Sequence, residues 1–594
     1  MAFDPRTLGA DCAHCPFAKG GCPDKPVPPS IPRGRTRYIL GGESPGDAER
    51  AQGRVFVGPT GHKLDRELGT AGLLRSEALV INSLCCMPPR EGKTEGMMGA
   101  ALRCCLPVYR HYVSQVVVPA LMMGKWAWRA LVTLDGTKLP KGGLSKGRGF
   151  LRDSPYLHNK YIATWHPTYA LSRNPYEWGA FRVDLARMAR LLTGKLRPGP
   201  ERLVTTPTVE DIWAVAYDRF VALDIETKPR SPRESWTGKD PRRARLDLIG
   251  LGNSEWGLSF DPAERPDLLA PLRRLLAEKV AITHNGITFD RPALDRAGIY
   301  IKRIVDTLHM RKALVATSPA SLAYCSSLYD DPYPWKEMGL EDPSEPPSEQ
   351  EWDEEDGGKD EEEFRGTEDD DKGLLYYARD PQAKRRYNAE DCVRTARIHV
   401  AMEAEPEWQS EQVQRLYQFR CNSAMLAVDM HEIGRMVDPE QRVALRSELE
   451  GLIVTRQKKL VEMAGIPSFT GSPNQMRSLL FKRHEKGVFH KFGLPLPTEK
   501  VGYTKTGLCA VNQDALLLLL VNPLISDEAK ALISQYWKVA APKKAKSTFV
   551  NSELIDQAIG DDGRLRPEMG SMRTDTGRWT EAKPSTVTLP KEKE

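Results

Sequence analysis

The stretch Phe220-Val221-Ala222-Leu223-Asp224-Ile225-Glu226-Thr227 decides the fold of the middle of this chain. Its first four residues are apolar and read as a buried strand, and the carboxylates of Asp224 and Glu226 follow directly. Side chains two positions apart on a strand face the same side of a sheet. Strand-like and helix-like runs alternate around it over residues 209–402, so we expect an α/β domain that presents two acidic side chains together.

Two later segments add acidic side chains. Asp290 closes the segment His284-Asn285-Gly286-Ile287-Thr288-Phe289-Asp290, and Tyr387-Asn388-Ala389-Glu390-Asp391 lies further along the chain. Tyr387 and Asp391 are four positions apart, so on a helix they share a face. Two divalent ions about 3.5–4 Å apart need such a cluster of carboxylates, and oxygen ligands suit Mg²⁺ or Mn²⁺. Scattered surface acids are the alternative interpretation.

In this order the acidic segments resemble the DEDDy exonucleases, the proofreading domains of DNA polymerases. The resemblance implies a ribonuclease H-like fold and 3′–5′ exonuclease activity, with Tyr387 orienting the attacking water. The metal ligands that it implies are Asp224, Glu226, Asp290 and Asp391. Residues 341–371 depart from the family because they are densely acidic. Such a composition predicts a disordered insertion, and a segment that shields the DNA channel is the alternative.

Residues 403–594 combine helical periodicity with a series of short motifs. These motifs are Ser472-Pro473-Asn474-Gln475-Met476, Phe492-Gly493-Leu494-Pro495, Thr504-Lys505-Thr506-Gly507 and Thr574-Asp575-Thr576-Gly577-Arg578-Trp579. They resemble the thumb and the start of the palm of family A DNA polymerases, which implies a mainly helical fragment. The basic residues expected to contact DNA phosphates are Lys543, Lys544, Lys546 and Arg578. Ordinary solvated helix faces are the alternative for the lysines.

The metal-binding palm aspartates and the fingers helix of that polymerase family do not follow in this sequence. Phosphoryl transfer from a nucleotide needs such carboxylates and their metals. We therefore expect no DNA synthesis by this chain alone. A separately encoded palm and fingers polypeptide, as a partner, is one explanation, and an interrupted or truncated gene is the other.

A third set of motifs occupies residues 1–195, ahead of a Pro-, Gly- and Thr-rich stretch, residues 196–208, that is expected to be a linker. An apolar strand at residues 38–40 leads into a turn rich in Gly and Pro, where backbone and a carboxylate can approach a ligand. The motifs are Gly42-Glu43-Ser44-Pro45-Gly46-Asp47-Ala48-Glu49, Gly53-Arg54-Val55-Phe56-Val57-Gly58, Val80-Ile81-Asn82 and Trp165-His166-Pro167-Thr168.

These motifs resemble the family 4 uracil-DNA glycosylases, the iron–sulfur type, which implies an α/β/α domain that excises uracil. By that resemblance Phe56 would stack on a flipped uracil and Asn82 would read its edge. His166 would stabilise the departing base, and Glu43 would assist water attack. One aromatic face, one amide and polar groups at the leaving base are what such recognition needs. Core packing is the alternative for Phe56 and His166. For residues 1–195 as a whole, the alternative is a domain that only senses uracil.

Eleven cysteines are present, and seven of them lie before residue 106. No secretory signal is visible, so clustered cysteines favour a metal or iron–sulfur centre over disulfides. The same resemblance implies a 4Fe–4S cluster held by Cys12, Cys15, Cys86 and Cys105. The doublets Cys85-Cys86 and Cys104-Cys105 leave each of those two choices open by one position. A zinc site and free buried thiols are the alternatives, and Cys22 is expected to be a spare thiol.

The formal net charge is +5 although residues 341–371 are strongly acidic, so the rest of the chain is clearly basic, which suits a DNA partner. The longest apolar stretch, residues 116–134, is broken by Lys125 and Arg129, and no membrane span is expected. We expect a replication and repair protein of the cytoplasm of a bacterium or a phage-infected host cell. A DNA-binding scaffold subunit of a split family A polymerase is the alternative.

Overall fold

The structure is a computed structural model that describes most of the chain. The described residues are 3–17, 25–89, 94–140, 143–174, 177–229, 240–330, 333–335, 380–481, 491–494, 509–550, 555–556, 559–560, 562–571 and 578–582. They form two compact units, Met1–Met425 and Leu426–Glu594. The first unit holds two β-sheets, and we refer to each sheet with its covering helices as the first and the second domain.

The first sheet has the strand order β2-β1-β3-β5-β4. Its strands are β1 (Tyr38–Gly42), β2 (Ala78–Asn82), β3 (Ala120–Met123), β4 (Leu151–Ser154) and β5 (Asn159–Thr164). Strands β1, β2, β3 and β5 run parallel, and β4 pairs antiparallel with β5. The carboxyl ends of the four parallel strands therefore meet along one edge, which is where open α/β sheets bind ligands.

Helices cover both faces of the first sheet because side chains alternate along each strand. Ile39 of β1 packs into a core with α3 (Glu95–Val113) and α4 (Lys125–Asp135). Tyr38 and Leu40 pack into the opposite core with α2 (Pro59–Thr70) and α6 (Trp178–Thr193). Shorter elements are η1 (Pro5–Leu8), α1 (Asp47–Gln52), η2 (Arg75–Glu77), α5 (Gly143–Gly147) and η3 (Tyr169–Arg173). The expected α/β class is confirmed, with three layers in this domain.

The second sheet has the order β11-β10-β7-β8-β9-β6 and is mixed. Its strands are β6 (Arg202–Val204), β7 (Phe220–Lys228), β8 (Arg245–Gly252), β9 (Trp256–Phe260), β10 (Val280–Thr283) and β11 (Ile304–Asp306). Strand β10 runs parallel to β7 and β11, whereas β8 is antiparallel to both its neighbours. Strand β6 lies inside residues 196–208, which were expected to be a linker, and pairs parallel with β9.

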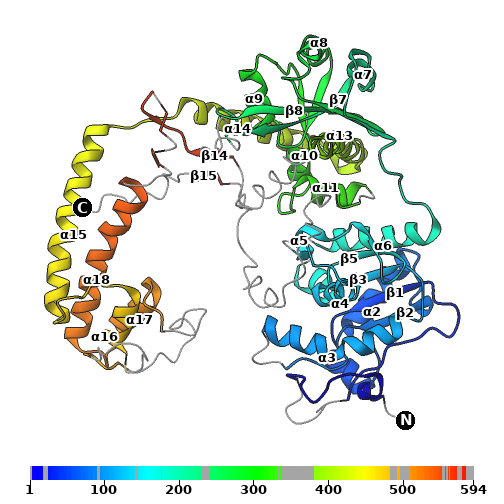
Figure 1. Ribbon diagram of the computed structural model, residues 1–594, viewed down its shortest axis with the longest axis horizontal. Helices are drawn as coiled ribbons and strands as arrows, with labels where there is room; N and C mark the ends of the chain where they lie inside the picture. The colour runs from blue at the N-terminus through cyan, green and yellow to red at the C-terminus, as the bar shows by residue number, and fades with distance from the viewer. Residues whose placement is uncertain are drawn as a thin grey trace. The chain divides into compact units, whose positions relative to one another are not determined.

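The two faces of β7 have different partners. Val221, Leu223 and Ile225 point into a core with α7 (Val209–Ala214), α8 (Leu269–Glu278) and α9 (Asp290–Arg296). Figure 1 shows α8 and α13 (Pro381–Glu403) on opposite sides of this sheet. Glycines on β8 and β9 let α13 lie close, because a Cβ at Gly250 would be 2.6 Å from Asn388 Oδ1 and one at Gly257 would be 2.4 Å from the Ala389 carbonyl oxygen.

Further helices complete the first unit. They are η6 (Pro266–Leu268), α10 (Thr307–Leu314), α11 (Leu322–Tyr329) and η9 (Pro406–Gln409), and α14 (Glu411–Ile433) begins in the first unit and ends in the second.

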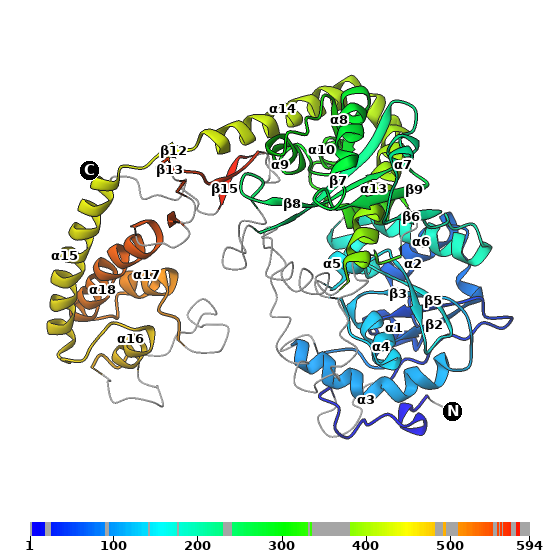
Figure 2. The ribbon, with the colours of Figure 1, turned by 45° about the horizontal axis from the view of Figure 1, so that its top comes forward.

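The second unit is mainly helical, as expected. Its helices α15 (Pro439–Ala464) and α18 (Asp527–Ala545) lie side by side in Figures 1 and 2. They run antiparallel: Gln535 Nε2 donates to the Arg456 carbonyl oxygen at 2.9 Å, and Lys546 pairs with Glu450 at 2.6 Å. The smaller elements are α16 (Pro473–Leu480), α17 (Gln513–Val521), η11 (Lys546–Val550) and the strand pairs β12 (Arg435–Met436) with β13 (Arg564–Leu565) and β14 (Glu568–Gly570) with β15 (Thr580–Ala582).

Some expectations fall outside the described residues. These are the acidic stretch at residues 341–371, Cys22 and the motif residues 504–507 and 574–577. Among the helices that the structure describes, none has the length and apolar character needed to cross a lipid bilayer.

Candidate functional site

Four predicted residues of the first domain gather at the carboxyl edge of its sheet. Glu43 follows β1, Asn82 ends β2 and His166 follows β5, while Phe56 lies in the loop between α1 and α2. The rings of Phe56 and His166 stack with centroids 6.4 Å apart and 30° between their planes. A Cβ on Gly42 would lie 2.3 Å from Asn82 Oδ1 and 2.6 Å from Phe56 Cζ, so this glycine lets the two side chains meet.

The carboxamide of Asn82 is buried, and neither its nitrogen nor its oxygen has a hydrogen-bond partner among the described residues. Buried polar atoms in folded proteins are nearly always paired, and an unpaired one costs about 1–3 kcal/mol. An amide kept unpaired beside an aromatic ring is therefore a feature that points to a ligand.

The backbone around Phe56 is held in an unusual conformation. Its φ is 52°, in the left-handed region that costs a non-glycine residue of order 1–3 kcal/mol. The Glu49 carboxylate accepts hydrogen bonds from the backbone N–H groups of Phe56 and Gly46. Arg75 Nη1 donates to the Phe56 carbonyl oxygen at 2.8 Å, and its guanidinium lies 5.9 Å from the ring centroid. The orientation of the ring is thus set by the hydrogen bonds of its own main chain.

Polar groups of Glu43 and His166 are also fixed. Glu43 Oε1 accepts from the Trp126 N–H at 3.2 Å, and Gly124, with φ +95°, leaves room for this carboxylate. The Thr168 N–H donates to His166 Nδ1 at 3.3 Å. Because Nδ1 accepts, the neutral imidazole carries its proton on Nε2 and can donate from there. Gly124 was not singled out from sequence, although a glycine directly after an apolar strand was the available signal.

The predicted cysteines come from three segments that pack together. Cys12, Cys85 and Cys105 are buried in one core, and Cys15 and Cys86 pack against it. The Asp11 N–H donates to the Cys104 carbonyl oxygen at 3.1 Å, which ties the N-terminal loop to α3. A hydrogen bond with Cys105, together with burial, raises the pKa of Cys85. Burial and the nearby Cys15 raise the pKa of Cys104 to about 11. Both members of each doublet therefore belong to this six-thiol group.

In the second domain, three of the four predicted metal ligands meet. Asp224, Glu226 and Asp391 each offer an oxygen, and these oxygens all lie within 4.8 Å of one another. They meet because Asp224 and Glu226 face the side of the sheet that α13 covers, and Asp391 lies on α13. Two residues missed from sequence orient the carboxylates. Asn388 Nδ2 donates to Asp224 Oδ2 at 2.8 Å, and Trp335 Nε1 donates to Asp391 Oδ1 at 2.5 Å.

Asp290 and Tyr387 lie beside this carboxylate group. Asp290 begins α9, and its Oδ1 accepts from the Ile225 N–H, between the two acids of β7, at 3.0 Å. Burial, with the Asp306 and Glu226 carboxylates nearby, raises the pKa of Asp290 to about 7. A bound cation would oppose that rise. Tyr387 is half-buried on α13, one turn before Asp391.

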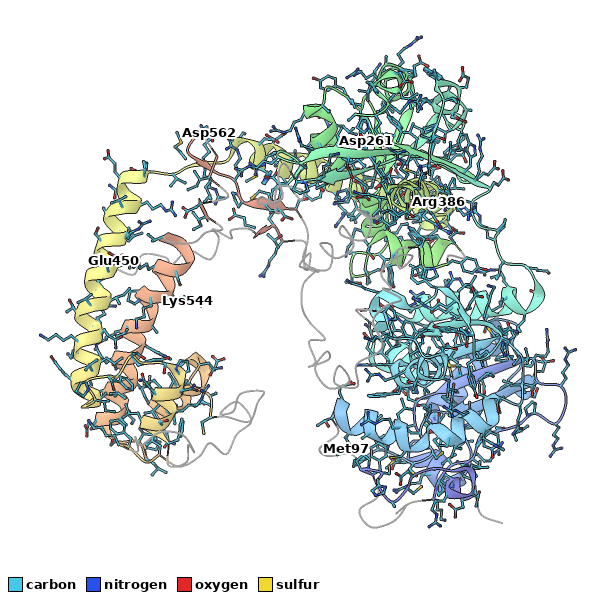
Figure 3. All side chains as sticks on the ribbon, in the orientation of Figure 1. Met97, Asp261, Arg386, Glu450, Lys544 and Asp562 are labelled. Carbon is cyan, nitrogen blue, oxygen red and sulfur yellow. The ribbon has the colours of Figure 1, made fainter. Side chains whose placement is uncertain are left out.

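The four basic residues predicted to contact DNA differ in whether they pair within the protein or lie exposed on its surface. Lys543 Nζ of α18 donates to Gln457 Oε1 at 2.9 Å, and Lys546, the first residue of η11, pairs with Glu450. These two lysines therefore join α18 and η11 to α15. Lys544, labelled with Glu450 in Figure 3, is exposed on α18. Arg578 is exposed just before β15. The helix-joining role of Lys543 and Lys546 was not predicted.

The first domain matches proteins of known activity. The profile of the uracil DNA glycosylase superfamily covers residues 28–185. The type-4 uracil-DNA glycosylase of Pyrobaculum aerophilum is 28% identical over 178 residues, which are 30% of this chain and 87% of that protein. The type-4 uracil-DNA glycosylase of Thermotoga maritima is 32% identical over 146 residues, which are 24% of this chain and 70% of that protein.

The chain also matches DNA polymerases over part of their length. DNA polymerase I of Streptococcus pneumoniae is 28% identical over 199 residues, 33% of this chain, and the chain spans 20% of that polymerase. Among solved structures, the POL domain of Pol1 from M. smegmatis, in complex with DNA primer-template and dNTP, is 15% identical with a TM-score of 0.44. That alignment covers 66% of this chain and 57% of the polymerase chain.

Proposed function

This chain belongs to the type-4 uracil-DNA glycosylase family through its first domain, and on that premise we propose that it excises uracil from DNA. The observation that carries the proposal is the unpaired, buried Asn82 amide beside the Phe56 ring. Recognition of a base turned out of the stack needs one aromatic face and hydrogen bonds to the base edge. DNA is accordingly the proposed partner.

The chemistry follows from the groups at the edge of the sheet. Phe56 stacks on the flipped base, and Asn82 offers one donor and one acceptor to a carbonyl oxygen and the adjacent N–H of uracil. As the bond from C1′ to the base nitrogen breaks, the base leaves with the electron pair, and His166 Nε2–H donates to its negative oxygen. Water then bonds to C1′ and gives its proton to the Glu43 carboxylate.

Replacement of His166 tests this arrangement. His166→Ala removes the donor to the departing base and should slow single-turnover uracil release by about 10²–10³-fold, as for other donors to a developing anion. His158→Ala is the matched control, because His158 is exposed in the turn between β4 and β5. Uracil release by His166→Ala at the wild-type rate would contradict the assignment. If the unmodified chain binds uracil-containing DNA but does not release uracil, the first domain is a uracil sensor and not a glycosylase.

The six-thiol group fits a 4Fe–4S cluster by the chemistry of its donors, since such clusters are held by four cysteine thiolates. We propose Cys12, Cys15, Cys86 and Cys105 as the ligands, with Cys85 and Cys104 as their neighbours. When bound, the cluster would supply a structural cross-link between the N-terminal loop, the segment after β2 and α3.

We propose metal-dependent 3′–5′ exonuclease activity as the function of the second domain. The grouping of Asp224, Glu226 and Asp391 favours it. These carboxylates, with Asp290 beside them, would hold two Mg²⁺ or Mn²⁺ ions, which would activate water and stabilise the leaving 3′ oxygen. Tyr387 would orient the water, while Asn388 and Trp335 hold two of the carboxylates in place.

The exonuclease proposal is tested with the double change Asp224→Ala and Glu226→Ala. Magnesium-dependent degradation of a 5′-labelled strand from its 3′ end should disappear, because the group would keep only one of its three carboxylates. Asp267→Ala, an exposed acid of the same domain, should leave degradation unchanged. The proposal is wrong if the double variant degrades DNA as the unmodified chain does.

We also propose that the second unit grips DNA as a polymerase thumb does, with the exposed Lys544 and Arg578 as phosphate contacts. Lys544→Gln should weaken DNA binding without sequence preference and reduce the slope of log affinity against log salt by about 1. An unchanged slope would assign Lys544 to an ordinary solvated helix face.

A further inference from the structure

Helix α11 of the second domain reaches the loop that carries His166. Tyr324, on α11, donates its hydroxyl hydrogen to Glu177 Oε2 at 3.1 Å. The same oxygen accepts from Trp165 Nε1 at 2.8 Å. Trp165 directly precedes His166, and its ring packs against Tyr169 with centroids 4.9 Å apart. One carboxylate oxygen therefore joins the second domain to the loop of the first domain's site.

The contact is built rather than incidental, because its polar members are buried and paired. Glu177 and Tyr324 are each 6% exposed. Glu177 directly precedes α6 and makes no side-chain capping hydrogen bond, and the helix dipole favours a negative charge at this end. The Arg148 guanidinium lies 5.3 Å from the Tyr324 ring centroid. Burial raises the pKa of Tyr324 to about 12, so the phenol keeps the hydrogen that it donates.

A second set of bonds fixes α11 against the first domain. Arg187 of α6 is fully buried, and its Nη2 donates to the carbonyl oxygens of Ser327 at 2.5 Å and Asp330 at 2.6 Å. Gly149, with φ +79°, permits the approach, since a Cβ there would lie 3.2 Å from Ser327 Cβ. Because the buried Arg187 bonds to two carbonyl oxygens at the end of α11, it restrains this helix, and Tyr324 with it, against the first domain.

We propose that Tyr324 and Glu177 are positioning residues for uracil excision, through which the second domain holds the His166 loop of the first. The proposal rests on the glycosylase function. Neither residue touches the base; they act through Trp165. The second domain is then required for full activity of the first, independently of any nuclease activity of its own.

The test compares two tyrosines of α11 in the full-length chain, the buried Tyr324 and the partly buried Tyr329. Tyr324→Phe removes the bond to Glu177, whereas Tyr329→Phe removes a bond between its hydroxyl and Arg311 Nη1, 2.9 Å away, within the second domain. Tyr324→Phe should slow single-turnover uracil release about tenfold, within what loss of a bond to a charged group allows, and leave affinity for uracil-DNA within about twofold. Tyr329→Phe should match the unmodified chain in both.

Glu177 supplies the conservative rescue. Glu177→Gln keeps an oxygen that can accept from Trp165 and should retain more activity than Glu177→Ala, with the difference in the rate of release rather than in DNA affinity. An unmodified release rate in Tyr324→Phe, measured on an active chain, would overturn the proposal.

Hydrogen exchange separates this proposal from the proposed function. The backbone amides of residues 165–170 should exchange faster in Tyr324→Phe than in Tyr329→Phe, whether or not the chain releases uracil. If the chain never releases uracil but the amides still exchange faster in Tyr324→Phe, the glycosylase function is refuted and the positioning of the His166 loop by the second domain is supported. Equal exchange in the two variants would refute the hold itself.

Discussion

The sharpest consequence of the first-domain site concerns Asn82, because its amide is buried without a hydrogen-bond partner among the described residues. Asn82→Ala removes both polar atoms from the place that we assign to the uracil edge. Two hydrogen bonds to the base, at about 1 kcal/mol net each, are lost, which corresponds to about a 30-fold lower kcat/KM. Single-turnover release from a uracil-containing strand measures this directly.

Asn82→Ala, although it slows uracil release, should not lower the stability of the folded chain. An unpaired buried amide costs the folded state free energy, so its removal should leave the free energy of unfolding within about 1 kcal/mol of the unmodified chain, or higher. Thermal unfolding without DNA measures this quantity. A residue that serves packing would show loss of stability together with loss of activity.

Asn253→Ala is the control with the reverse expectation. Asn253 is also buried, in the turn between β8 and β9, but its side chain bonds to the Val215 carbonyl oxygen and to the N–H groups of Glu255 and Trp256. Its truncation should lower the melting temperature and leave uracil release unchanged. If Asn82→Ala destabilises the chain as Asn253→Ala does and still releases uracil normally, the assignment of Asn82 is refuted.

Three further predictions concern the first unit. Gly42→Ala would place a Cβ 2.3 Å from Asn82 Oδ1 and should slow uracil release by more than about tenfold. Gly69→Ala, with open space around its Cβ, should leave the rate unchanged, and a normal rate in Gly42→Ala would argue against the site. Cys105→Ser should lower the iron content of anaerobically purified protein, whereas Cys325→Ser, at a buried cysteine of α11, should not. Equal iron content in these two variants would exclude Cys105 as a ligand. Burial lowers the pKa of His399 to about 4, so its contribution to the free energy of unfolding is fully present above pH 6.5. Up to about 3 kcal/mol of that free energy is lost as pH falls from 6.5 through 4. His399→Gln should flatten that part of the pH–stability curve, and an unchanged curve would contradict this.

The residues that group within each domain were predicted from sequence, by strand and helix spacing for Asp224 with Glu226 and by resemblance to known families for the rest. The two-residue period of β7 placed Asp224 and Glu226 on one face, and the structure covers that face with α13. In the first domain, Glu43, Asn82 and His166 each follow or end a parallel strand, so they meet at one edge. Strand direction explains both groupings in the structure, whereas the resemblance to known families was needed to choose these residues from the sequence.

What could not be predicted depends on contacts between distant segments or on weak local patterns. Strand β6 has only three residues, with one polar side chain, and becomes recognisable only through its pairing with β9. The left-handed backbone of Phe56 depends on Glu49 and Arg75. Tyr324 and Glu177 are 147 positions apart, and no motif announces their pairing.

Uracil excision by the full-length chain is the central claim, and one measurement tests it most directly. The anaerobically purified protein is incubated in EDTA with a 5′-labelled single strand containing one uracil, and the product is then treated with alkali. EDTA removes the divalent ions that the proposed exonuclease needs, so loss of label from the 3′ end cannot confuse the result. We predict a break at the uracil that is absent from a thymine control. An unbroken strand, from protein that retains its iron–sulfur absorbance, would contradict the claim.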